Sequence, residues 1–486
     1  MAMEVIWTRA FTPVLQTEVY SFASIVSVYL GATFLGSLWY RRNLRSGRVH
    51  SLVVLVSLLA LAAFLPALVN DFRFMKPNWM GQVSLISSAF LLAGICPFCA
   101  VLGYLTPGLI DGYATGRPAE AGKAYAINVV GCILGPLFAS YVLLPWISEK
   151  NALVLLSLPF LGYYLFLSRT LPPKRRWAWG LVGSTMLVWV LFFAEDYENA
   201  LIKFKPGTTV RRDYAASTIS FGEGRDKHLL VNGVGMTWLT PITKFMAHLP
   251  LAYHQGRPQS VLIICFGMGT TYRSALSWDA NVTAVELVPG VTQAFEFFHA
   301  DARHYLENPK GRIVIDDGRR YLMRTRERFD VIVIDPPPPP ETAGSSLLYS
   351  REFYELAKQH LQPHGILQTW VPPGDVSIGQ ATARSISETF PYTRAFRPVE
   401  GLGIHLLASM EPIESLDTGQ LTAKMPEKAK QDLLEWSDSP NAPVYLGRVV
   451  SNEVDLARFL DPDPEIQVTD DRPYNEYFLL RHWKLF

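Results

Sequence analysis

The segment VLIICFGMGTTYRSAL (residues 261–276) decides the fold of the second half of the chain. Its first six residues form an apolar run that is typical of a buried strand. The run leads into Gly267-Met268-Gly269, and a helix is predicted to follow from about Thr271. A buried strand, a glycine turn and a helix in succession predict the first unit of an α/β sheet.

The same alternation repeats along the following hundred residues. Further strands are predicted at VTAVEL (282–287), RIVID (312–316), FDVIVID (329–335) and GILQTWV (365–371), with helices at 319–328 and 350–361. Strands that alternate with helices favour a parallel sheet covered on both faces. We therefore predict a Rossmann-like domain of the class I methyltransferase type over residues 251–486.

Each of the first four predicted strands ends in glycine or acid. Gly267 and Gly269 follow the first strand, Glu286 ends the second, Asp316 and Asp317 follow the third, and Asp335 ends the fourth. Because ligands on such sheets bind at the carboxyl ends of the strands, these residues predict a binding site at one edge. Glu286 lies at about the spacing from the glycines at which an acid binds a ribose diol.

The glycine turn differs from that of a dinucleotide site. The third glycine of the G-x-G-x-x-G pattern is replaced by Tyr272. The turn therefore favours recognition of a nucleoside without a pyrophosphate, which indicates S-adenosylmethionine or a related molecule.

The first half of the chain is far more apolar. Crossing a bilayer takes about 20 apolar residues, and six windows reach or approach that length: 11–40, 51–69, 79–105, 124–146, 151–168 and 177–194. Five of them contain no Asp, Glu, Lys or Arg, and the first contains only Glu18. We predict a transmembrane helical domain of about six spans over residues 1–196.

The distribution of basic residues bears on topology. Clusters at 41–48 and 169–176, with Arg117 and Lys123 between them, place alternate loops in the cytoplasm. Six spans then put the chain beyond Ala194 on the opposite side, where a cytosolic metabolite would not reach it. We expect an integral protein of a prokaryotic inner membrane, with the side of the soluble part left open. The net charge of +1 gives no attraction to nucleic acid.

A short segment links the two halves. Residues 208–240 alternate polar and apolar side chains between glycine turns, which predicts a small antiparallel sheet. We assign residues 205–250 to this β-subdomain. Tyr214 lies on it and is a candidate polar group for the site.

At these residues the chain resembles the spermidine synthase (polyamine aminopropyltransferase) family, and most closely its membrane-fused branch. The matching stretches are TPITKFMAHLPLAYH (240–254), VLIICFGMGTTYRSAL, VTAVEL, DDGRRYL (316–322), FDVIVIDPPPPP (329–340), the segment 347–372 and TDDRPYNEY (469–477). The resemblance implies a small β-domain on a Rossmann-like sheet. It also implies attack by an amine on the carbon next to a sulfonium, with release of 5′-methylthioadenosine.

The resemblance also assigns roles to residues. Glu286 would bind the ribose hydroxyls, Asp317 with Gly318 would lie at the adenine, and Asp335 would hold or deprotonate the amine. The candidate catalytic residues are Asp335, which the resemblance implies, and Tyr214, which is a candidate only because of its place on the β-subdomain. Binding of the donor, with no metal, is assigned to Gly267, Met268, Gly269, Glu286, Leu287, Asp316, Asp317, Gly318 and Asp335.

Several positions depart from the family pattern. Met268 replaces the acid that binds the ammonium group of decarboxylated S-adenosylmethionine, and Ala216-Ser217 replace a Tyr-Gln pair. The acidic run that helps bind the polyamine is replaced by TPITKFMAH, and a second acid after the fourth strand falls on Pro338. Burying a polyamine without acids costs several kcal/mol per charge.

These departures lead us to favour cleavage of intact S-adenosylmethionine. The donor's own α-amine would attack its γ-carbon, releasing methylthioadenosine and azetidine-2-carboxylate. Aminopropyl transfer from decarboxylated S-adenosylmethionine to a polyamine or other amine is the first alternative, and methyl transfer is another. A transporter or sensor with a nucleoside-binding soluble module is an alternative of a different class. The expected partners are the sulfonium substrate and the lipid bilayer, and a homodimer is left open.

Overall fold

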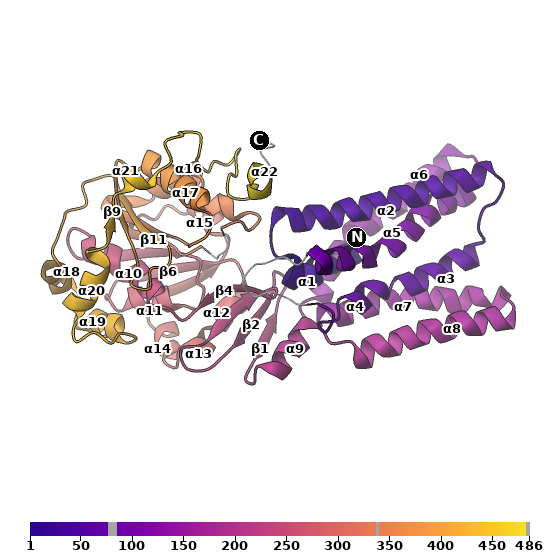
Figure 1. Ribbon diagram of the computed structural model, residues 1–486, viewed down its shortest axis with the longest axis horizontal. Helices are drawn as coiled ribbons and strands as arrows, with labels where there is room; N and C mark the ends of the chain where they lie inside the picture. Colours follow the sequence, from indigo (N-terminus) through magenta and orange to yellow (C-terminus); the bar gives the residue numbers. More distant parts are fainter. Residues whose placement is uncertain (76–84, 337–339, 483–486) are drawn as a thin grey trace. The chain divides into compact units, whose positions relative to one another are not determined.

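The computed structural model describes residues 1–75, 85–336 and 340–482. The chain divides into two compact units (Figure 1). The first comprises Met1–Ile219 with Val231–Val234, and the second comprises Ser220–Leu230 with Gly235–Phe486. The division therefore falls within the four strands that follow the helices.

The first unit is helical. Its helices are α1 (Ala2–Leu15), α2 (Val19–Arg45), α3 (Leu52–Ala62), α4 (Leu65–Val69), α5 (Leu85–Ala114), α6 (Pro118–Phe138), η1 (Ala139–Leu143), α7 (Glu149–Leu167), η2 (Ser168–Thr170), α8 (Pro173–Val188), η3 (Trp189–Phe193) and α9 (Tyr197–Phe204). Six helical segments of the described chain are long and apolar enough to cross a membrane, in agreement with the predicted number. Helix α6 buries none of its residues, as expected of a helix that faces lipid.

The first predicted span begins too early. The chain breaks between α1 and α2, because Gln16 adopts a left-handed conformation with φ of 64°. Glu18 then occupies the N-cap position of α2 rather than the interior of a span. Glu18 therefore lies at the N-terminal end of a helix, where negative charge is favourable, and not in the interior of a membrane helix, where it would be costly.

Helices α2 and α5 pack at very short range through glycine. A Cβ atom on Gly36 would lie 2.0 Å from the carbonyl oxygen of Ala100, and one on Gly103 would lie 2.1 Å from that of Thr33. Ser37 adds a hydrogen bond of 2.9 Å from its hydroxyl to the carbonyl of Gly103. Small residues that let two backbones approach are typical of helix pairs in membranes.

Two sheets follow the helices. The four-stranded sheet contains β1 (Thr209–Arg212), β2 (Ser217–Phe221), β3 (His228–Val231) and β4 (Val234–Trp238) in sequential order, as the predicted meander over 208–240 requires. The larger sheet has the order β12-β10-β11-β9-β8-β5-β6-β7. Its strands are β5 (Ser260–Ile264), β6 (Asn281–Glu286), β7 (Gly311–Ile315), β8 (Phe329–Ile334), β9 (Leu361–Val371), β10 (Tyr392–Phe396), β11 (Ile404–Ser409) and β12 (Glu453–Val454).

The five predicted strands form the parallel part of this sheet, β7-β6-β5-β8-β9. The expectation of a wholly parallel sheet is wrong at the other side, since β11 pairs antiparallel with β9, and β10 pairs antiparallel with both β11 and β12. The short polar and aromatic strands β10 and β12 gave no strong periodic signal, and pairing to an existing edge forms them. The predicted helix 319–328 is also shorter, ending at Arg324.

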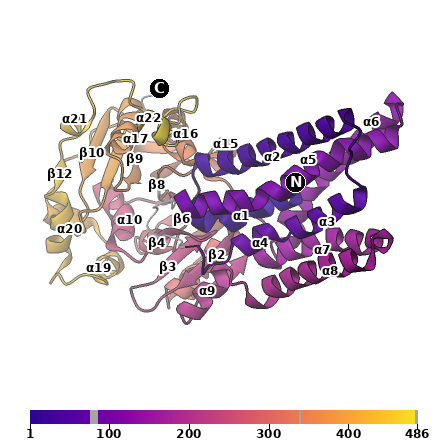
Figure 2. The same cartoon turned by 45° about the vertical axis from the view of Figure 1, so that its right-hand side comes forward.

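Helices cover both faces of the larger sheet (Figures 1 and 2). One layer contains α10 (Pro241–Tyr253) and α11 (Thr270–Leu276), and the other contains α15 (Gly318–Arg324), α16 (Arg351–Gln359) and α17 (Val376–Thr389). The remaining elements of this unit are α12 (Pro289–Gln293), α13 (Phe295–Phe298), α14 (Ala302–Leu306), η4 (Ser345–Leu348), α18 (Thr418–Lys424), α19 (Glu427–Leu434), α20 (Ala442–Val450), α21 (Leu456–Phe459) and α22 (Phe478–His482). The apolar residues of β5, β6 and β8 lie between the two layers and form the core.

Candidate functional site

The row of predicted residues lies along one edge of the parallel sheet. Backbone hydrogen bonds continue past the strand ends, from Asp316 N to the Glu286 carbonyl at 3.0 Å and from Asp335 N to the Ile264 carbonyl at 2.9 Å. Cys265 N likewise donates to the Val285 carbonyl at 2.9 Å. The ends of β7, β6, β5 and β8 are thus neighbours in that order, which confirms the edge that the sequence predicted.

Exposure changes abruptly at this edge. The strand residues 261–264 and 331–334 are buried, whereas Cys265, Gly267 and Asp335 immediately beyond them are partly exposed. Asp316, Asp317 and Gly318 after β7 are also partly exposed. The core therefore opens to solvent at the carboxyl ends of the strands, where a small molecule can reach polar groups.

The glycine turn requires its glycines. Gly267 and Gly269 have φ of 55° and 78°, a region that favours glycine. A Cβ on Gly269 would lie 2.4 Å from the ring of Phe295. Met268 between them is 4% exposed, and Tyr272, in place of the third glycine, packs its ring against Phe266 and Phe295. Close packing by aromatic rings leaves the turn without the open approach that a pyrophosphate needs.

Glu286 is buried and holds the glycine turn. Its Oε2 accepts a hydrogen bond of 2.8 Å from Phe266 N, and its Oε1 accepts one of 2.9 Å from Val288 N. Burial raises the pKa of Glu286, while these backbone hydrogen bonds act in the opposite direction. Backbone N–H groups of Leu287 and Gly267 also interact with this carboxylate, so a ribose hydroxyl would share its acceptor positions with the backbone of the turn. Leu287, which follows Glu286, is largely exposed at the same edge.

Asp335 has a different environment. Its Oδ2 lies 3.0 Å from the hydroxyl of Thr271, and no lysine or arginine in the described part of the chain forms an ion pair with it. Although part of the side chain is accessible, the surrounding protein raises the pKa of Asp335 to about 7. The nearby Glu286 adds to this rise, and the hydrogen bond with Thr271 opposes it. A carboxyl with a pKa near neutrality can take up and release a proton at physiological pH.

The acids after β7 are engaged locally. Asp317 is the N-cap of α15, where its Oδ1 accepts a hydrogen bond of 2.7 Å from Arg320 N, and Asp316 pairs with the guanidinium of Arg320. A Cβ on Gly318 would lie 2.3 Å from Cγ2 of Ile264, so the helix start approaches β5 closely. These contacts fix the edge beside Glu286.

Residues 469–477 are interpreted from the sequence chiefly as a turn and the start of a helix. In the structure this C-terminal segment also contacts the chain that follows Asp335. Asn475 donates from Nδ2 to the Pro340 carbonyl at 2.6 Å and to Ser345 Oγ at 2.8 Å. Glu476 accepts a hydrogen bond of 3.0 Å from Ser346 N. Both side chains are buried, so they position this loop from behind. The predicted acid replacement at Pro338 lies outside the described residues.

A buried charge network, which the sequence did not reveal, joins three helices behind the glycine turn. Asp432 accepts hydrogen bonds from Lys244 and His248 of α10 and from Arg273 and Ser274 of α11. Burial opposes ionisation of Asp432, but these donors outweigh it and lower its pKa. The network fixes α11, which carries Thr271, against α10.

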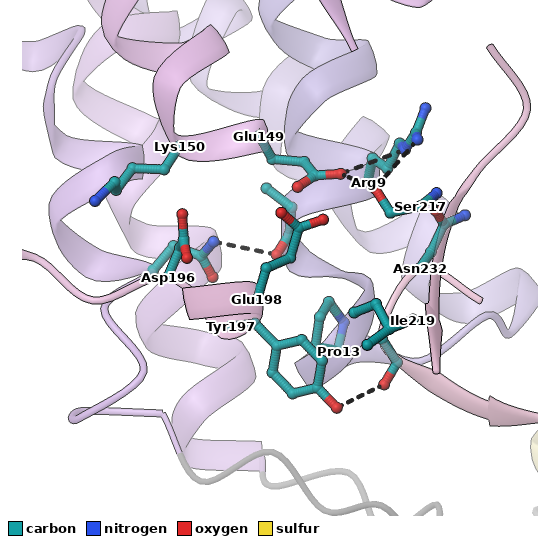
Figure 3. A pocket seen from close by; sticks show the side chains of 13 residues that line it. Arg9, Pro13, Glu149, Lys150, Asp196, Tyr197, Glu198, Ser217, Ile219 and Asn232 are labelled. Carbon is teal, nitrogen blue, oxygen red and sulfur yellow. Dashed lines mark hydrogen bonds and ion pairs between the residues drawn. The ribbon is translucent and has the colours of Figure 1, made fainter. Parts of the chain in front are cut away.

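The first unit contains a separate polar crevice (Figure 3). Arg9 lies 3.4 Å from Glu149, and Glu198 points into the same crevice, with one carboxylate oxygen that has no partner among the described residues. Tyr214, predicted as a catalytic group, is 47% exposed and stacks on Tyr141 of the same unit at 5.7 Å. The sequence singled out none of the three charged residues, because they are far apart along the chain.

Together, the strand order and the glycine turn define a Rossmann-like domain of the methyltransferase type, with a row of acids at one edge of its sheet. Among the described residues, His, Cys, Asp and Glu nowhere gather in a group that could hold a metal ion.

Comparison with known proteins shows which family this domain resembles. Residues 240–392 match the family described as the spermine/spermidine synthase domain. The chain is 34% identical over 145 residues to the polyamine aminopropyltransferase of Sulfurisphaera tokodaii, covering 29% of this chain and 44% of that protein. Over 409 residues it is 27% identical to polyamine aminopropyltransferase 1 of Streptomyces coelicolor, covering 77% of this chain and 72% of that protein. The residues matched by the family model all lie in the second unit.

The similarity covers only part of the length of these relatives. Across six polyamine aminopropyltransferases, the chain spans between 44% and 62% of the relative's own length. The crystal structure of the spermidine synthase of Thermotoga maritima superposes with a TM-score of 0.39 at 22% identity, covering 49% of this chain and 82% of that chain.

Proposed function

We propose that the protein transfers an aminopropyl-type group from the sulfonium of an S-adenosylmethionine-derived donor to an amine, releasing 5′-methylthioadenosine. The observation that carries this proposal is Asp335. A carboxyl with a pKa of about 7 lies next to the glycine turn and Glu286, inside a spermine/spermidine synthase domain. Decarboxylated S-adenosylmethionine is the proposed donor, because the similar proteins are polyamine aminopropyltransferases.

The proposed step moves one alkyl group and one proton. The lone pair of the amine nitrogen attacks the carbon next to the sulfonium, the new C–N bond forms, and the C–S bond breaks with its electron pair left on sulfur. The proton displaced from nitrogen passes to Asp335. A base with a pKa near the working pH is well suited to this transfer, and the sulfonium needs no further activation to leave.

The other edge residues are proposed to bind the nucleoside. Glu286 accepts hydrogen bonds from the ribose hydroxyls beside those that it accepts from the backbone. Asp317 and Gly318 lie on the adenine side, and Gly267 and Gly269 allow the alkyl chain to approach the backbone. This arrangement places the reacting carbon between the turn and Asp335, which supplies the positioning that such reactions mainly require.

A second candidate is cyclisation of intact S-adenosylmethionine to azetidine-2-carboxylate. Met268 favours it: the residue is buried between the two glycines and cannot pair with the ammonium group of a decarboxylated donor. Without an acid there, the carboxylate of the intact donor meets no repulsion. The donor's own α-amine then serves as the nucleophile, and Asp335 takes its proton.

One experiment separates these functions. The full-length protein in detergent micelles is incubated with decarboxylated S-adenosylmethionine plus a diamine, with each alone, and with intact S-adenosylmethionine, and products are measured by mass spectrometry. Methylthioadenosine that forms only with the decarboxylated donor and an amine supports transfer. Methylthioadenosine with azetidine-2-carboxylate from intact donor supports cyclisation. S-adenosylhomocysteine, or nucleoside binding without any product, would refute both. Asp335→Asn is the matched inactive control.

We also propose that the first unit anchors the protein in a lipid bilayer through its six apolar helices. Recovery of the protein in the membrane fraction after a carbonate wash would support this, and release into the soluble fraction would contradict it.

A further inference from the structure

The hydroxyl of Thr271, which contacts Asp335, lies within hydrogen-bond distance of a second oxygen as well. Thr271 is the second residue of α11 and is 1% exposed. Its Oγ1 lies 3.0 Å from Asp335 Oδ2 and 3.1 Å from the backbone carbonyl oxygen of Thr243 on α10. The hydroxyl carries one proton, but it stands within hydrogen-bond distance of two oxygens.

The two neighbours have different abilities. The Thr243 carbonyl can only accept a hydrogen bond, whereas the carboxyl of Asp335 accepts when ionised and can donate when protonated. With Asp335 ionised, the Thr271 hydroxyl donates to it. With Asp335 protonated on Oδ2, the carboxyl O–H donates a hydrogen bond to Thr271 Oγ1. The Thr271 hydroxyl then turns and donates its own hydrogen bond to the Thr243 carbonyl. Each protonation state of Asp335 therefore has a fully formed contact with Thr271.

We propose that Thr271 is a positioning residue that holds the carboxyl of Asp335 in both protonation states, by turning its hydroxyl from Asp335 to the Thr243 carbonyl as Asp335 takes the proton of the attacking amine. This inference rests on the proposed function of Asp335 as that proton acceptor. No proton moves onto Thr271 during the step. The C–N bond forms, the C–S bond breaks with its electron pair on sulfur, and the nitrogen's proton ends on Asp335.

The surroundings make this hydroxyl important. The titratable groups near Asp335 are Glu286 from β6, Cys265 after β5 and Tyr349 before α16. All three are neutral or negative, so none of them stabilises an ionised Asp335 by opposite charge.

The cations on the two packed helices are engaged elsewhere. Lys244 of α10 and Arg273 of α11 both bind Asp432 and Glu435. These ion pairs fix α11 against α10 and so fix the distance of Thr271 from the Thr243 carbonyl. The Thr271 side chain is therefore held in place by the packing of α11 against α10, and only its hydroxyl proton has to change direction.

Two variants test the proposal in the full-length protein. Thr271→Val keeps the shape and removes the hydroxyl, and Thr271→Ser keeps the hydroxyl. Since a hydrogen bond to an ionised carboxylate is stronger than one to a neutral carboxyl, its loss raises the pKa of Asp335. We expect the acid limb of the kcat profile of Thr271→Val to move up by about one pH unit, with an unchanged KM. Thr271→Ser should return the limb to its original position.

A second readout does not depend on turnover. Infrared difference spectra, recorded against pH, detect the C=O stretch of a protonated carboxyl, and the band that disappears in Asp335→Asn belongs to Asp335. We expect its midpoint to rise in Thr271→Val and to be restored in Thr271→Ser. An identical midpoint in Thr271→Val and the unaltered protein would overturn the inference. Absence of methylthioadenosine in every reaction would refute the proposed function, while the infrared midpoint would still decide the contact between Thr271 and Asp335.

Discussion

Replacing Asp335 with asparagine should stabilise the protein in a pH-dependent way. The native state keeps a proton on Asp335 up to about pH 7, whereas an ordinary aspartic acid releases it near pH 3.8. Between these values the native state binds more protons than the unfolded chain, so the free energy of unfolding falls as pH rises. Asparagine does not titrate, and Asp335→Asn therefore escapes this loss while keeping a group that can bond to Thr271.

The size of the effect follows from the shift. From pH 5 to pH 8, the ionisation of Asp335 spans about two pH units below its native pKa, and each unit corresponds to about 1.36 kcal/mol. Partial exposure of the side chain reduces the resulting figure, and we expect the stability advantage of Asp335→Asn to grow by about 2 kcal/mol over this range. Glu286 also has a raised pKa in both proteins, and its effect on Asp335 is already contained in the raised pKa of Asp335.

Thermal unfolding of the detergent-solubilised full-length proteins at pH 5 and pH 8 measures this advantage. A difference of about 2 kcal/mol shifts the midpoint of a domain of about 250 residues by roughly 4–8 °C. Asp417→Asn is the matched control, because Asp417 accepts a hydrogen bond of 2.8 Å from Gln420 N as an exposed N-cap, and asparagine caps equally well. If the midpoints of Asp335→Asn and the unaltered protein differ by the same amount at both pH values, Asp335 does not have a raised pKa.

Three further substitutions probe the rest of the structure. Met268→Asp should raise kcat/KM for the decarboxylated donor relative to the intact donor by about 10- to 100-fold, because it adds a partner for the ammonium group; an unchanged ratio in competition assays would contradict the role of Met268. Gly36→Ala should destabilise the helical unit by about 1–3 kcal/mol, since its Cβ would lie 2.0 Å from the Ala100 carbonyl, whereas Gly31→Ala has open space and should not; equal melting of the two variants refutes the packing. Asn475→Ala should cost about 1–3 kcal/mol, because it removes two buried hydrogen bonds, to the Pro340 carbonyl and to Ser345 Oγ; thermal unfolding and limited proteolysis measure this, and full resistance would show that other contacts hold the loop.

The sequence revealed the parallel sheet because each strand carried its own signal. The apolar runs of β5 and β8 ended in Gly267 and Asp335, and strand direction alone placed these ends at one edge. The antiparallel strands were not predicted, since β10 and β12 are short and each depends on a pairing partner, β11 for β10 and β10 for β12. Local patterns predict elements that would form in many contexts, and they miss those that form only when a neighbour is already in place.

The same limit applies to the site. Asp335 and Glu286 were predicted because strand ends place them, but Thr271 and Asn475 act through contacts between segments far apart in the chain. Thr271 meets Asp335 across 64 residues, and Asn475 meets Pro340 across 135. A residue whose role depends on such a contact carries no signature in its own stretch of sequence.

The partners of the four acids at the edge decide which of them performs chemistry. Asp317 caps a helix, Asp316 pairs with Arg320, and Glu286 accepts backbone hydrogen bonds that favour its ionised form. Asp335 receives one hydroxyl that is shared with a competing carbonyl, so its charged form has little support. An acid that must accept a proton during the reaction has to be one that the fold does not hold firmly in the ionised state. Under the proposed function, the row that the sequence showed as four similar carboxylates therefore separates into three that shape the edge and bind the nucleoside, and one, Asp335, whose pKa suits the proton transfer.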